Sequence, residues 1–147
     1  MTKNKRLSPN WEEYAEVVRD ILWNCQVIEE GLRRYLISSY EYIRKAIGGS
    51  LPFRFDRKDI EKDSMGALVD KFEKLSDNSS LVTHLKSLTK HRNKCAHRGF
   101  TLTVKEWCDD DFIAKELKNL LEIRSSSEAC ASSVVKEYKR LEALLKE

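Results

Sequence analysis

One uninterrupted apolar seam near the start of the 147-residue chain constrains its fold more than any other feature. Between residues 11 and 47, apolar side chains recur at alternating spacings of three and four, at Trp11, Tyr14, Val18, Ile21, Cys25, Ile28, Leu32 and Tyr35. This heptad pattern predicts one long helix, and it is typical of an antiparallel bundle or a coiled coil. Gly48 and Gly49 are expected to end the helix.

The same spacing predicts three more helices. Asp63 or Ser64 can cap a second helix, whose apolar face spans 65–75, and a third runs from Leu81 to about Arg98, before Gly99. The aspartates at 109–111 favour the start of a last helix, whose pattern continues to Leu145. Within it, residues 124–133 are mostly small or polar, and this segment either kinks the helix or lets another chain approach closely.

The connections and the ends complete the predicted architecture. Residues 50–63 read as a charged connection, with a solvated loop at 54–63, and residues 100–108 as a short extended arm or a tight loop. We predict an all-α protein, an up-and-down bundle of four to five helices. Residues 1–10 are expected to form a flexible basic tail and residues 11–147 a single helical domain.

Composition excludes several classes of protein. No stretch approaches the roughly 20 apolar residues of a membrane span, and the first ten residues lack the apolar run of a secretory signal. The four cysteines form no CxxC pair and match no zinc-finger spacing. We therefore expect a cytoplasmic protein with free thiols, without a membrane partner, a metal site or a cofactor.

Positive charge is concentrated in one segment. The chain has a net charge of +3, whereas residues 79–100 contain five Lys or Arg and no acidic residue, which leaves −2 for the remainder. All three histidines also lie there, at positions 84, 91 and 97. Such a patch suggests an anion-binding surface, although a solvated, lysine-rich helix face gives the same pattern.

Arg92 is the unusual residue of this segment, because it continues the apolar stripe of Leu81, Leu85 and Leu88. An inward-facing arginine needs a partner, such as a carboxylate, another protomer or a bound phosphate. Asn93 and His97 are four residues apart and share one helix face, whereas His97 lies about 140° around the helix from Arg92. A two-fold axis near this helix would bring two such sets together.

The motif Arg92-Asn93-x-x-x-His97, in the third helix of an all-α chain, resembles that of the HEPN superfamily. The resemblance implies a HEPN-like bundle and a metal-independent endoribonuclease that cleaves single-stranded RNA through the ribose 2′-hydroxyl. It also implies a homodimer, with the motif residues of two protomers in one cleft. A toxin, defence or stress role follows, with an antitoxin-like or nucleotidyltransferase partner.

The resemblance assigns a role to each motif residue. His97 would assist proton transfer, Arg92 would bind the scissile phosphate, and Asn93 would orient one of them by hydrogen bonding. Beside them, Lys90, Lys94 and Arg98 are candidates for binding the RNA backbone.

Other interpretations of the same residues stay open. Arg92 can instead pair with Glu29 or Glu30 of the first helix, and His97 can cap its own helix. The protein would then be a catalytically inactive dimerisation module that binds a protein or a nucleotide. Three weaker alternatives are a metal site built from His84, His91 and Cys95, a nucleophilic Cys95, and a DNA-binding helical protein.

Overall fold

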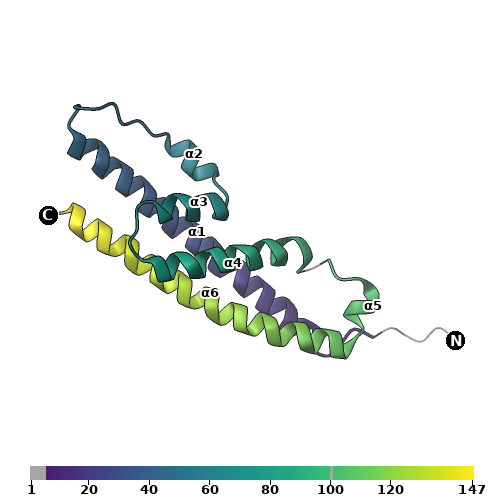
Figure 1. Ribbon diagram of the computed structural model, residues 1–147. Helices are drawn as coiled ribbons and strands as arrows, with labels where there is room; N and C mark the ends of the chain where they lie inside the picture. The colour runs from purple at the N-terminus through teal and green to yellow at the C-terminus, as the bar shows by residue number, and fades with distance from the viewer. Residues whose placement is uncertain (1–5, 100) are drawn as a thin grey trace.

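A computed structural model describes residues 6–99 and 101–147. Within these ranges the chain forms six helices and no strand, which confirms the all-α prediction (Figure 1). The helices are α1 (Trp11–Ile47), α2 (Arg57–Lys62), α3 (Met65–Glu73), α4 (Ser79–Arg98), α5 (Val104–Trp107) and α6 (Asp110–Leu145). None of the described helices has a stretch apolar and long enough to cross a membrane.

The two long helices, α1 and α6, lie side by side and run in the same direction (Figure 1). Asp20 pairs with Arg124, and Asn24 donates a hydrogen bond to Ser127, so each contact joins residues separated by 103 or 104 positions. This near-constant offset is the mark of a parallel pair. In an up-and-down bundle of four helices the first and the last would be antiparallel, whereas in one of five, the other predicted number, they would be parallel.

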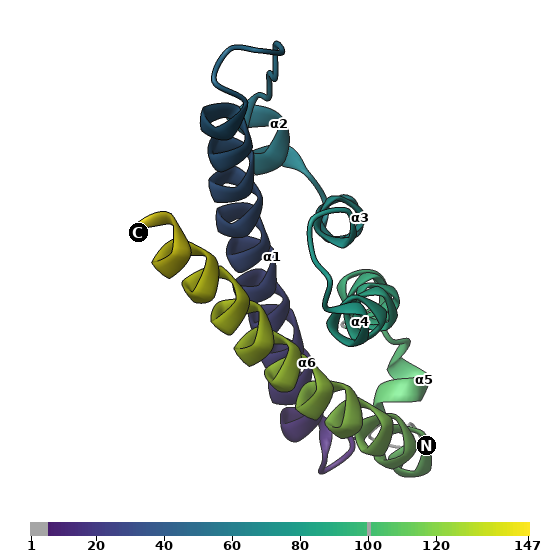
Figure 2. The same ribbon diagram turned by 60° about the vertical axis from the view of Figure 1, so that its left-hand side comes forward.

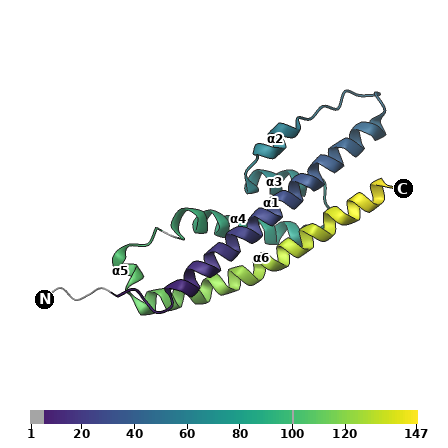
Figure 3. The ribbon, with the colours of Figure 1, turned by 180° about the vertical axis from the view of Figure 1, so that it is seen from behind.

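The shorter helices cover one face of the α1–α6 pair. Figure 2 shows α3 and α4 on one side of it, and Figure 3, from behind, shows α1 and α6 in front of them. Helix α4 is antiparallel to α1, since Arg92 lies against Glu29 while Gly99 lies against Val18. The core fills the space between the pair and this covering layer, and Ile28, Leu68 and Leu85 are fully buried there.

Two predicted connections are helical instead. Helix α2 occupies part of the expected loop because Asp56 caps its N-terminus and the single apolar side chain, Ile60, is 2% exposed. Helix α5 occupies 104–107, within the segment 100–108 expected as an extended arm or a loop, and residue 100 lies outside the described residues. Thr103 and Glu106 form a capping box there, in which each side chain satisfies the backbone N–H of the other. That local hydrogen bonding outweighs the β propensity of Thr and Val.

The ends of the long helices differ from the predictions in small ways. Gly48 ends α1 in the left-handed conformation, with φ 59°, as predicted. Ser8 is 1% exposed and its N–H bonds to the carbonyl of Trp107, so the part of the predicted tail next to α1 is attached to α5. Residues 1–5 of that tail lie outside the described residues.

Candidate functional site

Arg92 lies on the inner side of α4 and contacts a carboxylate of α1. Its Nη2 atom is 3.5 Å from Oε1 of Glu29, and the side chains are 35% and 13% exposed respectively. The inward stripe of α4 therefore does bring Arg92 to α1, to one of the two carboxylates expected from the sequence. The guanidinium remains partly open to solvent on its other side.

Glu29 has a second cation beside it, which the sequence did not reveal. Arg33, one turn further along α1, places Nη2 3.6 Å from Glu29 Oε2 and donates a hydrogen bond to the carbonyl of Asp63. Both residues flank the buried positions Ile28 and Leu32, so their charged ends reach the edge of the core. The only signal in the sequence was a charged i,i+4 pair beside the seam.

This cluster of Glu29, Arg33 and Arg92 is electrostatically unsaturated. Two guanidinium groups share one carboxylate, which leaves a net charge of +1. Two of its polar atoms are buried without a hydrogen bond among the described residues: Oε1 of Glu29 accepts none, and Nε of Arg33 donates none. A half-buried arginine with free N–H groups and excess positive charge is a suitable partner for a phosphate.

Asn93 and His97 lie on a different side of α4. Both are exposed, and their side chains make no hydrogen bond within the described part of the chain, so His97 does not cap the helix with its ring. The backbone carbonyl of His97 accepts a hydrogen bond from the Thr101 hydroxyl at 2.9 Å. The structure thus joins Asn93 and His97 on one face and does not bring them to Arg92.

The remaining predicted phosphate contacts flank that exposed face. Lys90 and Lys94 are exposed and stand one turn apart on α4, close in angle to His97. The side chain of Arg98 lies outside the described residues. The exposed face of α4 therefore combines an imidazole, an amide and two ammonium groups.

A cavity of about 310 Å³ opens beside the C-terminal end of α4. It lies between α4, α5 and the first turns of α6, and Tyr14 of α1 forms part of its floor. Burial raises the pKa of Tyr14 to about 12, and the nearby Glu116, Cys95 and Glu106 add to that effect. No local sequence pattern indicates this cavity, because its walls come from four separate helices and the connection between α4 and α5.

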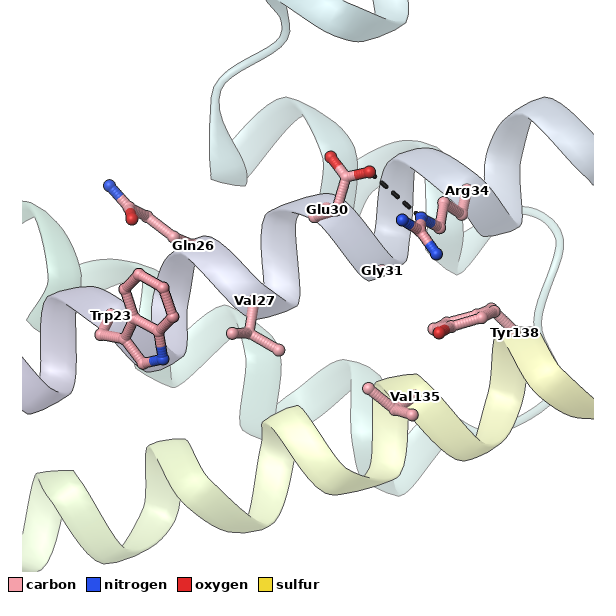
Figure 4. A pocket seen from close by; sticks show the side chains of 8 residues that line it. All are labelled: Trp23, Gln26, Val27, Glu30, Gly31, Arg34, Val135 and Tyr138. Carbon is pink, nitrogen blue, oxygen red and sulfur yellow. Dashed lines mark hydrogen bonds and ion pairs between the residues drawn. The ribbon is translucent and has the colours of Figure 1, made fainter.

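A second hollow follows the uncovered face of α1 and α6 (Figure 4). Trp23, 66% exposed, stands at one end, and Tyr138 lies near Arg34 at the other. Between them Gly31 lets the helices approach: a Cβ there would be 2.7 Å from Cγ1 of Val134. Of the small residues in the segment 124–133, Ser127 and Cys130 are buried, and α6 continues through this segment without a break.

The alternatives based on metal or thiol chemistry lose support. Within residues 6–99 and 101–147, no group of three or more His, Cys, Asp or Glu could hold a metal ion. His91 lines the cavity at the end of α4, whereas His84 lies in a separate depression against α6. Burial raises the pKa of the Cys95 thiol, which disfavours the reactive thiolate.

Comparison with known proteins gave no match: no protein-family model, no curated protein and no solved structure matches the chain.

Proposed function

We propose that this protein is a HEPN-like, metal-independent endoribonuclease that cleaves single-stranded RNA. The observation that carries the proposal is the partly exposed Arg92, held 3.5 Å from Glu29 in a cluster with excess positive charge. An arginine that served only the fold would be expected to meet its carboxylate in a bidentate hydrogen bond. Here the pairing is loose and leaves donors for a phosphate.

The proposed reaction uses the 2′-hydroxyl of the RNA as nucleophile. This oxygen attacks phosphorus, the bond to the 5′-oxygen breaks, and the products carry a 2′,3′-cyclic phosphate and a 5′-hydroxyl. His97 would assist in moving the proton between these two oxygens, and Arg92 would stabilise the charge on the phosphoryl oxygens. Asn93, on the same face as His97, would orient the imidazole or the phosphate.

The separation of Arg92 from His97 supports a site shared between two protomers. Their directions differ by about 140° around α4, and the two side chains have different environments, one against α1 and one in solvent. In a two-fold dimer with α4 near the axis, Arg92 of one protomer would lie opposite His97 of its mate. The exposed lysines at positions 90 and 94 would then border the cleft.

The decisive experiment measures cleavage of labelled single-stranded RNA in EDTA by wild type, Arg92→Ala and His97→Ala. We expect 2′,3′-cyclic phosphate ends with wild type and a loss of at least about 100-fold in either variant. Mixing the two inactive variants should restore about one quarter of the wild-type rate, because half of the dimers would regain one intact composite site. Thermal melts establish that the variants are folded.

Two results would contradict this proposal in different ways. Wild type that leaves RNA intact excludes the nuclease. Cleavage that persists in both folded variants places the active site elsewhere. A mixture that stays inactive while the single variants behave as expected would reject only the shared site.

The second candidate function is a catalytically inactive HEPN-like module that dimerises and binds a protein or a nucleotide. The observation that favours it is the contact of Arg92 with Glu29, which gives Arg92 a structural role without RNA. A regulatory partner, such as an antitoxin-like or nucleotidyltransferase protein, fits either function. So does a cytoplasmic toxin, defence or stress role.

A further inference from the structure

The cavity at the end of α4 has the build of a ligand site. Its volume of about 310 Å³ lies at the lower end of the range of about 300–1,000 Å³ found for small-molecule sites. Helix α5, held by its capping box, contributes Glu106 to the lining, and the start of α6 contributes Phe112 and Glu116. Helices contribute most of the lining, and Gly99 and Leu102, from the connection between α4 and α5, complete it.

Its lining combines an apolar floor with a few charged groups. Cys95, Leu120 and Ile123 are buried beneath it, and the half-buried Phe112 offers an aromatic surface. Glu106 and Glu116 supply carboxylates, and the exposed Lys94 supplies an ammonium group at the rim. An apolar floor with a small number of polar groups suits a flat heteroaromatic ring that is recognised by its edge.

We infer that this cavity binds the guanine base of an RNA strand, and this inference rests on the proposed function. Guanine alone among the four bases presents two adjacent N–H donors, N1–H and N2–H, on its Watson–Crick edge, beside the acceptor O6. A carboxylate accepts both donors at once, and an ammonium group donates to O6. Glu116 and Lys94 are the residues we assign to these contacts.

The same lining discriminates against the other bases. Each of the other bases places at least one acceptor where guanine has one of these two donors: N1 of adenine, N3 and O2 of cytosine, and O2 of uracil. A carboxylate would face that acceptor without a proton between them, and unpaired polar groups at a buried edge are costly. Glu106 gives one oxygen to Thr103 in the capping box, so Glu116 is the freer carboxylate.

The position of the cavity connects it to the proposed cleavage site. Lys94 belongs both to the rim of the cavity and to the exposed face of α4 that carries His97 and Lys90. A strand whose phosphates follow that face could therefore place one base in the cavity. Guanine at a fixed position next to the cleaved bond would give the nuclease its sequence preference.

The test uses binding, so that its outcome does not depend on cleavage. Hexanucleotides with 2′-O-methyl riboses, which cannot be cleaved through the 2′-oxygen, would differ only in carrying guanine, hypoxanthine or adenine at one position. Fluorescence anisotropy with wild type should give about tenfold tighter binding for guanine than for hypoxanthine, which lacks the N2 amino group. Glu116→Gln should abolish that preference, whereas Glu122→Gln, on an exposed position of the same helix, should keep it.

Each outcome separates this inference from the proposed function. Equal affinity for guanine and hypoxanthine, absence of binding, or a preference that survives in folded Glu116→Gln overturns the guanine site, whether or not RNA is cleaved. If wild type prefers guanine but does not cleave RNA, the guanine site is retained and the nuclease function is rejected. A titration with GMP distinguishes a guanine in RNA from a free guanine nucleotide as the ligand. If GMP binds as tightly as the oligonucleotide, the cavity is a site for a free guanine nucleotide, and the assignment to RNA is overturned.

Discussion

Neutralising Glu29 should destabilise the fold more than neutralising Arg92. Glu29 is 13% exposed and lies between two guanidinium groups, at 3.5 and 3.6 Å. Each contact corresponds to a gross attraction of about 5 kcal/mol at an effective dielectric constant of about 20. Desolvation opposes most of it, so we expect Glu29→Gln to lower the free energy of unfolding by about 2 kcal/mol, because it also leaves Arg33 facing Arg92.

Arg92 should matter less to stability, since its side chain is 35% exposed and solvent screens its single contact. Arg92→Gln also leaves Glu29 with Arg33 as a partner. We therefore expect a loss of at most about 1 kcal/mol. In thermal unfolding the two changes correspond to decreases in Tm of about 4–8 °C for Glu29→Gln and below about 4 °C for Arg92→Gln.

Urea unfolding followed by circular dichroism measures both variants. The matched control is Glu30→Gln at the next position, whose pair with Arg34 is more than half exposed and should give no measurable change. A larger loss in Arg92→Gln than in Glu29→Gln would refute this reasoning. It would make Arg92 chiefly a structural residue and would support the inactive module as the function.

Two further predictions concern packing and thiol chemistry. Gly31→Ala should lower stability by about 1 kcal/mol, because crowding against Val134 outweighs the gain in helix propensity, whereas Gly66→Ala, with its nearest neighbour at 3.6 Å, should raise stability by up to about 1 kcal/mol. Urea unfolding decides this, and stabilisation by Gly31→Ala would contradict the close α1–α6 approach. Iodoacetamide at pH 8 should alkylate the half-exposed Cys108 well before Cys25, whose pKa burial raises to about 12. Intact-protein mass spectrometry would show this, and equally fast labelling of Cys25 in the native protein would argue against its burial.

The helices that carry long apolar patterns could be predicted, and the relation between them could not. The range of α1 and the capping of α3 by Ser64 follow from periodicity and side-chain chemistry. Helix α2 has only Ile60 buried, too little for a periodic signal. That short helix runs back along α1, since Arg57 pairs with Glu41 while Arg33 reaches Asp63, and so adds one reversal of direction. One reversal changes the first and last helices from antiparallel to parallel.

In the candidate site, the positions of some residues are determined by one helix, and those of others by the packing of several helices. Arg92 could be placed inward, and Asn93 with His97 on another face, because the angles around a single helix fix them. Arg33 and the cavity beside α4 depend on how α1, α2, α5 and α6 pack, and no local pattern encodes that. Side-chain chemistry shared among distant segments was therefore the part that sequence reasoning missed.

The arrangement around α4 gives the two functional candidates different requirements. An inactive module needs only the inward side, where Arg92 meets Glu29, and it leaves the exposed His97, Asn93, Lys90 and Lys94 without a task. A nuclease uses both sides, but only if a second protomer or the RNA itself spans the 140° between Arg92 and His97. The two candidates therefore differ in whether Arg92 and His97, on two sides of α4, act together in one active site. Recovery of RNA cleavage on mixing Arg92→Ala with His97→Ala tests this directly, because neither variant alone contains a complete site.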